Sequence, residues 1–316
     1  MKAKWLAVLA ACAFAGLVGS YYALDSEKNI LDQAERMRLG GSYIELTNGV
    51  THYQLTGPVH GRVVVLIHGG TVAGWIWEKQ VEALAGAGYR VLQYDQFGRG
   101  FSDRPDVAYD RGLYVRQLIE LVDKTGLPEK FDLIGVSFGG AIAVSFAATH
   151  ADRVRTLTLI SPLVSRFKVP TIFRMPIVGE FAARIIGIDM LVERLVALLE
   201  GVPDSAHYEE RFVEQTTYAG FQRSLLSMVR SDALGDYGSE YRAVGRQTRE
   251  ALLIWGTADE EISRSMIDQA RSSIPDLRFE PVEGAGHGIM LQRPEVVNDL
   301  VLGFLRDTNA HSTAPQ

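Results

Sequence analysis

The sequence predicts an α/β fold built on a mainly parallel, doubly wound sheet with helices on both faces. Three observations lead to this prediction. Short apolar runs typical of buried strands alternate with helical stretches along most of the chain. Residues 62–67 are almost entirely apolar, as a central strand covered on both faces should be. Only the first two predicted strands meet at a tight-turn signal, Asn48-Gly49, so only they should form an antiparallel hairpin.

The predicted elements follow in order along the chain, with glycine and proline marking several of their ends. The strands are expected at residues 42–46, 50–55, 62–67, 90–94, 131–136, 154–160, 251–255 and 277–282. The helices of the core are expected at residues 78–87, 113–124, from Gly139 onward, 263–272 and 295–305.

The alternation of predicted strands and helices stops between residues 163 and 244, which contain no clear strand but several helical stretches rich in Ile, Leu, Met and Phe. The strongest helical pattern covers residues 175–199. This block is predicted to be a helical lid inserted into the core, whose apolar residues either pack on the core or face lipid. The predicted division of the chain is a signal or anchor segment (1–25), a linker (26–41), core (42–162), lid (163–244), core (245–307) and a disordered tail (308–316).

Composition excludes several classes of function. The chain has 316 residues, of which 47% are hydrophobic and 22% charged, enough for one large core with an insertion. Its formal net charge is −6 and it has no basic run, which argues against nucleic acid as a partner. Because Cys12 is the single cysteine, neither an intrachain disulfide nor a cysteine metal cluster can form.

The N-terminal segment predicts an apolar helix associated with a membrane. Lys2 and Lys4 precede an uncharged stretch, residues 5–23, which as a helix would span about 28 Å. It fits an uncleaved anchor, a signal cleaved after Ser20, or a lipoprotein signal at Cys12. Each alternative predicts that the bulk of the chain is anchored to the membrane or exported, and is extracytoplasmic, although Arg36 and Arg38 weaken that orientation.

Ser137 is the candidate nucleophile. It stands in Gly135-Val-Ser137-Phe-Gly139, between a predicted strand and a predicted helix. Such a turn forces strained backbone angles on the serine and exposes its hydroxyl above the carboxyl edge of the sheet, where glycines let the backbone pass. Because a chain with 31 glycines can contain this motif by chance, the assignment of Ser137 as nucleophile also requires a base and an acid elsewhere in the chain.

Asp259 and His287 are the candidate partners, and each follows a predicted strand. A hydroxyl is a poor nucleophile unless an imidazole accepts its proton, and a carboxylate must orient the ring. Alone, Asp259 would be an ordinary helix cap and His287 an ordinary loop histidine. In the chain order Ser, Asp, His they predict a catalytic triad.

The backbone N–H groups of Gly70 and Phe138 are the candidate oxyanion donors. Phe138 follows the nucleophile, and Gly70 lies just past a central strand in His68-Gly69-Gly70. His68 is expected to form local hydrogen bonds that shape this loop. The reaction that these groups would catalyse requires neither a metal nor an organic cofactor.

These motifs together resemble those of the α/β-hydrolase superfamily, in its branch of lid-bearing serine esterases and lipases. The resemblance covers nearly all of residues 42–307. It rests on the motifs around Gly70, Ser137, Asp259 and His287, and on Asp95-x-x-Gly98-x-Gly100-x-Ser102. It implies the α/β-hydrolase fold and the triad named above. One departure is the proline that many relatives have shortly after the acid, which is replaced here by Ile262 and Ser263.

The sequence argues against several of the reactions that members of this superfamily catalyse. Ser137 argues against the relatives that use an aspartate nucleophile, haloalkane dehalogenases and epoxide hydrolases, and Thr71 replaces a proline of the prolyl aminopeptidases. The leading prediction is a carboxylesterase or monoacylglycerol-type lipase acting on a small-molecule acyl ester. The alternatives are a carbon–carbon bond hydrolase or amidase using the same triad, and a noncatalytic membrane-associated binding protein. The oligomeric state is not predicted.

Overall fold

The computed structural model describes residues 2–313, and in it the predicted strands form one eight-stranded sheet. The strands are β1 (Ser42–Leu46), β2 (Gly49–Thr56), β3 (Val63–Ile67), β4 (Arg90–Tyr94), β5 (Phe131–Val136), β6 (Val154–Ile160), β7 (Ala251–Gly256) and β8 (Arg278–Val282). Their order in the sheet is β1-β2-β4-β3-β5-β6-β7-β8. The β1–β2 and β2–β4 pairs are antiparallel and the other pairs are parallel, so the predicted fold class is confirmed.

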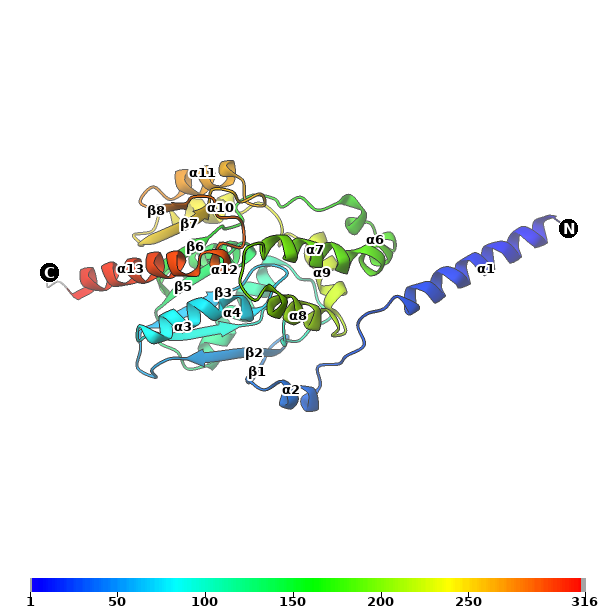
Figure 1. Cartoon of the computed structure of the whole chain (residues 1–316), viewed down its shortest axis with the longest axis horizontal. Helices are drawn as coiled ribbons and strands as arrows, with labels where there is room; N and C mark the ends of the chain where they lie inside the picture. The colour runs from blue at the N-terminus through cyan, green and yellow to red at the C-terminus, as the bar shows by residue number, and fades with distance from the viewer. Residues whose placement is uncertain (1, 314–316) are drawn as a thin grey trace.

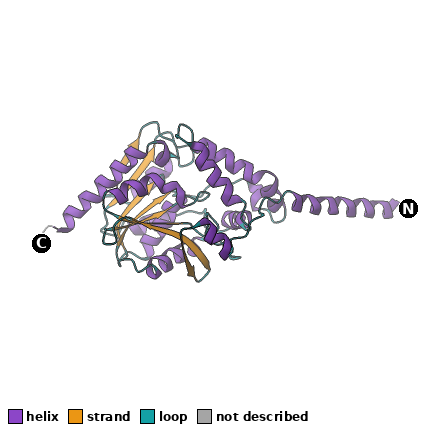
Figure 2. Ribbon diagram, turned by 60° about the horizontal axis from the view of Figure 1, so that its bottom comes forward, coloured by secondary structure: helices purple, strands orange, loops and turns teal. Residues whose placement is uncertain are grey.

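Helices cover both faces of this sheet (Figure 2). Outside the segment between β6 and β7, called the lid below, the helices of the chain are α1 (Lys2–Ala23), α2 (Gln33–Leu39), η1 (Gly74–Trp77), α3 (Glu78–Gly86), α4 (Arg111–Lys124), α5 (Phe138–Thr149), α11 (Arg264–Ser273), α12 (Ile289–Gln292) and α13 (Pro294–Thr313). The last helix is longer than predicted and includes the first part of the expected tail, while residues 314–316 of that tail lie outside the described residues.

Alternate residues of the central strands feed two separate apolar cores. In β3, Val63, Val65 and Ile67 pack toward α4 and α5, whereas Val64 and Leu66 pack toward α3, α12 and α13. This follows from the pleat, which points successive side chains to opposite faces. A strand buried on both faces must therefore be continuously apolar, as β3 is.

The inserted segment between β6 and β7 is helical, as expected, and lies at the carboxyl edge of the sheet (Figure 1). It consists of η2 (Thr171–Arg174), α6 (Val178–Ala182), the π-helical turn η3 (Ala183–Gly187), α7 (Ile188–Leu198), α8 (Ser205–Thr216), α9 (Phe221–Arg230) and α10 (Gly238–Val244). The stretch predicted as one strong helix is thus divided by a π-helical turn. Helix α10 packs against α5 and α11 and belongs to the core.

The segment expected as a linker is docked on the lid. The Glu27 carboxylate accepts hydrogen bonds from the N–H groups of Gly220 and Gln222, at the start of α9, and the Tyr218 hydroxyl donates to Glu35. A carboxylate at a helix N-terminus satisfies N–H groups that have no partner within the helix. Charged side chains therefore hold this segment in place.

Helix α1 extends away from the body of the molecule (Figure 1). Among residues 2–313, no helix combines the length and the apolar character that a membrane crossing requires.

Candidate active site

Ser137 lies at the sharp turn between β5 and α5, with φ 54° and ψ −121°. The turn is possible because both flanking glycines lie against backbone. A Cβ atom on Gly135 would lie 2.3 Å from the carbonyl oxygen of Gly139, and one on Gly139 would lie 2.2 Å from that of Ile67. A side chain at either position would push β3, β5 and α5 apart. The strained conformation of Ser137 is thus enforced by close packing.

Asp259 and His287 come together although they lie in separate loops, after β7 and β8. Nδ1 of His287 lies 2.8 Å from Oδ2 of Asp259, and both side chains are buried. The other carboxylate oxygen accepts hydrogen bonds of 2.9 Å from the N–H groups of Glu261 and Ile262. Burial by itself would raise the pKa of Asp259, but the His287 contact and the Ile262 N–H hold it below its ordinary value. Asp259 therefore stays ionised and orients the ring.

A second carboxylate faces the same ring. Oε2 of Glu261 lies 3.2 Å from Nε2 of His287, and Arg194 of lid helix α7 binds both oxygens of this carboxylate. Burial would raise the pKa of Glu261, but the hydrogen bonds from Arg194 and the charge of His287 hold it below its ordinary value. This contact was not predicted from the sequence, where its one local signal was an acidic residue two positions after Asp259.

Ser137 and His287 line the same small cavity, of about 40 Å³, together with Gly70. Within the described part of the chain there is no hydrogen bond between the serine and the histidine, because Nε2 of the ring faces Glu261. The structure thus brings Asp259 and His287 into contact and places Ser137 at the wall of the cavity that they face.

Gly70 and Phe138 are neighbours above Ser137. A Cβ atom on Gly70 would lie 3.4 Å from that of Phe138, and one on Gly69 would lie 3.6 Å from that of Ser137. Over residues 2–313, neither the Gly70 nor the Phe138 N–H donates a backbone hydrogen bond outside regular helices and strands. Both donors are therefore available to an oxygen atom bound beside Ser137.

Two buried side chains hold the loop that contains Gly70. Nδ1 of His68 lies 2.7 Å from the Gly69 carbonyl oxygen, and its Nε2 accepts from the Gln96 N–H at 2.8 Å, as expected for a structural role. Burial lowers the pKa of His68 to about 4, so the ring is neutral. Arg99, whose role was not predicted from the sequence, donates to the Gly70 carbonyl oxygen (2.6 Å) and to Ser224 of α9 (2.8 Å).

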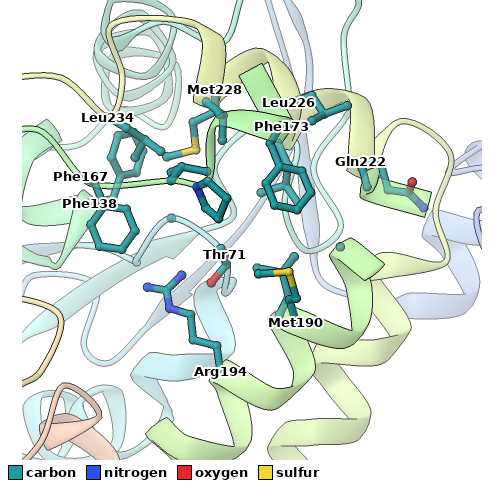
Figure 3. Close-up of a pocket in the computed structure, with 18 of the residues that line it drawn as sticks. Thr71, Phe138, Phe167, Phe173, Met190, Arg194, Gln222, Leu226, Met228 and Leu234 are labelled. Atoms are coloured by element: carbon teal, nitrogen blue, oxygen red, sulfur yellow. The ribbon is translucent and has the colours of Figure 1, made fainter. Parts of the chain in front are cut away.

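A larger cavity of about 210 Å³ lies between Ser137 and the lid. Figure 3 shows Phe138, Phe167 and Leu234 grouped at one end and Gln222 at the other. Most of its wall is apolar, formed by Leu163, Phe167, Val169, Pro170, Phe173, Ile188, Met190, Leu191, Leu225, Leu226, Met228, Val229 and Leu234. Such a cavity suits a flexible hydrocarbon chain. The described residues contain no cluster of His, Cys, Asp and Glu side chains suited to a metal ion.

Comparison with known proteins matches most of the chain to one family. Residues 64–300 match the family model described as "Alpha/beta hydrolase family". The chain is similar to the AB hydrolase superfamily protein YfhM of Bacillus subtilis, with 26% identity over 83% of this chain and 96% of that one. It is also 26% identical to the carboxylesterase YbfK of the same organism, over 83% of this chain and 86% of that one.

Among solved structures, the meta-cleavage product hydrolase CumD of Pseudomonas fluorescens superposes with a TM-score of 0.67 at 25% identity. That match covers 84% of this chain and 98% of the other.

Proposed function

This chain belongs to the alpha/beta hydrolase family, and from that premise we propose that it is a serine hydrolase of carboxylic esters. Ser137 is the nucleophile, His287 the general base and acid, and Asp259 the group that orients the imidazole. The observation that supports this most directly is the strained turn at Ser137 beside the cavity that His287 lines, with His287 bonded to Asp259.

The proposed reaction follows from these positions. The Ser137 oxygen attacks the ester carbonyl while its proton passes to Nε2 of His287, once the ring has turned from Glu261 toward the serine. The negative charge that develops on the carbonyl oxygen is stabilised by the N–H groups of Gly70 and Phe138. His287 then gives the proton to the leaving alcohol, and water releases the acyl group from Ser137 by the same route.

The larger cavity supports an acyl chain as the group transferred to Ser137. Its volume of about 210 Å³ and its apolar wall leave room for an acyl chain longer than that of an acetate ester. We therefore expect kcat/KM to rise from acetate to an acyl chain of intermediate length and then to fall. A series of p-nitrophenyl esters from acetate to palmitate tests this, and a steady rise to the longest chain would contradict it.

The decisive test replaces the proposed nucleophile. Ser137→Ala is expected to lose both p-nitrophenyl ester hydrolysis and covalent labelling by a fluorophosphonate probe, since the variant lacks the hydroxyl that attacks in the proposed reaction. Ser145, a buried serine in α5, provides the control, and Ser145→Ala should still be labelled. Labelling that persists in Ser137→Ala would refute the assignment, and a wild-type chain that is never labelled would favour a noncatalytic binding protein.

A second candidate is hydrolysis of a carbon–carbon bond in an acidic substrate. The similarity to a meta-cleavage product hydrolase favours it, as does Lys168 on the cavity wall, whose ammonium group is suited to binding a carboxylate. Both reactions use the same nucleophile, so labelling does not separate them. A substrate panel does, because an esterase should hydrolyse simple esters faster than vinylogous diketones by orders of magnitude.

We further propose that the N-terminal segment directs the chain out of the cytoplasm. Lys2 and Lys4 followed by an uncharged stretch support this, as does the extension of α1 from the body of the molecule. Cell fractionation with mass analysis of the N-terminus tests it. Recovery of the intact chain solely from the cytosol would contradict it.

A further inference from the structure

The imidazole of His287 lies between two carboxylates, and the second one occupies the direction that the base must use. Nδ1 is 2.8 Å from Asp259 and Nε2 is 3.2 Å from Glu261. When Nδ1 donates its proton to Asp259, a neutral ring has only a lone pair at Nε2, which a carboxylate repels. The Glu261 contact is therefore favourable only when Nε2 also has a proton, and a ring in that state cannot accept one from Ser137.

Arg194 competes with His287 for this carboxylate. Its Nε and Nη2 atoms bind both oxygens of Glu261, the two-pronged geometry in which arginine binds a carboxylate most strongly. Arg194 belongs to lid helix α7, whereas Glu261 belongs to the loop after β7. The charged groups placed against the ring are thus Asp259 and Glu261, with Arg194 reaching it through Glu261.

The end of α7 also contacts the His287 loop directly. The Leu198 carbonyl oxygen accepts a hydrogen bond of 3.2 Å from the side chain of Gln292, which in turn accepts from the Gly286 N–H at 2.9 Å. A Cβ atom on Gly288 would lie only 2.1 Å from the same Leu198 oxygen. The position of α7 is therefore linked to that of the His287 loop by two contacts of Leu198, one with Gln292 and one with Gly288.

We propose that Glu261 is a positioning residue whose carboxylate is shared between His287 and Arg194, so that the lid controls when the base is free. With α7 in place, Arg194 neutralises Glu261 and weakens its hold on the ring. When α7 moves away, the unpaired carboxylate binds the Nε2 side of the ring more strongly, so the ring does not turn toward Ser137 and the serine is not activated. This coupling rests on the proposed roles of Ser137, His287 and Asp259, and it adds a residue to the control of that site.

Two substitutions should change the pH dependence of Ser137 labelling in opposite directions. The experiment measures the second-order rate of labelling of the full chain by a small alkyl fluorophosphonate between pH 5 and 9. For Glu261→Gln, the pH of half-maximal labelling should fall by about one unit, because a charge that stabilises the protonated ring is lost. For Arg194→Gln it should rise, since Glu261 is no longer neutralised. In the double variant the effect of Arg194→Gln should disappear.

The matched control uses a different Arg–Glu pair, in which both residues belong to the lid. Arg230 of α9 binds Glu180 of α6 with both oxygens engaged. Arg230→Gln should leave the pH of half-maximal labelling unchanged. Circular dichroism and thermal unfolding check that each variant is folded, and Glu261→Ala replaces Glu261→Gln if the latter is not.

Shifts in the same direction for the two single variants, or no shift in either, would overturn the proposal while Ser137 is still labelled. Labelling that does not depend on Ser137 would instead refute the proposed function, and this inference with it.

Discussion

Gly139→Ala is expected to destabilise the protein although alanine is the better helix former. Gly139 is the second residue of α5, a helix buried along most of its length. A Cβ atom there would lie 2.2 Å from the carbonyl oxygen of Ile67 and 2.4 Å from that of His68. Both are backbone atoms at the end of central strand β3, so no flexible side chain can move aside.

The expected magnitude follows from that geometry. To reach an ordinary contact of 3.4 Å, the helix and strand must separate by about 1.2 Å. Overpacking of this kind costs about 1–3 kcal/mol or more, against about 1 kcal/mol that alanine contributes in a helix. We expect a net loss of up to about 2 kcal/mol in the free energy of unfolding, which for a chain of 316 residues lowers Tm by up to about 3 °C. Because His68 lies in the oxyanion loop, kcat should also fall at least about tenfold.

Urea unfolding and ester hydrolysis measure the two effects, and Gly303→Ala is the matched control. Gly303 lies in α13, and a Cβ atom there would have no atom within 4 Å. This variant should gain up to about 1 kcal/mol and keep its kcat. If Gly139→Ala were as stable and as active as Gly303→Ala, the close packing of the turn would not be what constrains Ser137.

Three further predictions follow from the site and its support. Asp259→Asn should lower kcat for esters about 10⁴-fold with little change in KM, because an amide favours the wrong tautomer of His287; a drop below tenfold would argue against its role. Asp95 is buried, which alone would raise its pKa, but His52 and backbone N–H groups hold that pKa at about 2. Its charged form therefore contributes about 2 kcal/mol of stability above about pH 4, and this contribution is lost as the pH falls toward about 2. In urea unfolding, Asp95→Asn should be less stable than the wild type at pH 7, and its stability should change less between about pH 4 and pH 2. An unchanged dependence of stability on pH would contradict this. Leu234→Trp should partly fill the larger cavity and reduce kcat/KM for octanoate at least about tenfold while acetate hydrolysis stays within about twofold; equal losses on both esters would show that the acyl chain binds elsewhere.

The elements whose signals are local were predicted closely. The hairpin at Asn48-Gly49 and the strand at residues 90–94 appear as expected, because turn chemistry and side-chain alternation act between neighbouring residues. The inserted segment was predicted to be helical, but not that η3 interrupts its longest helix or that α10 packs in the core. Those features depend on which surfaces the helices meet, and helical periodicity does not encode them.

The sequence by itself determined the chemical groups and the strand ends that present them, since the motifs around Ser137, Asp259 and His287 are short and defined by spacing. Only the tertiary structure decided that Glu261 faces the imidazole and that Arg194 reaches it from the lid. The physical reason is that such contacts join elements far apart in the chain. They form only where the packing of α7 against the sheet edge brings charged side chains within hydrogen-bond distance, and no local pattern of residues specifies that packing.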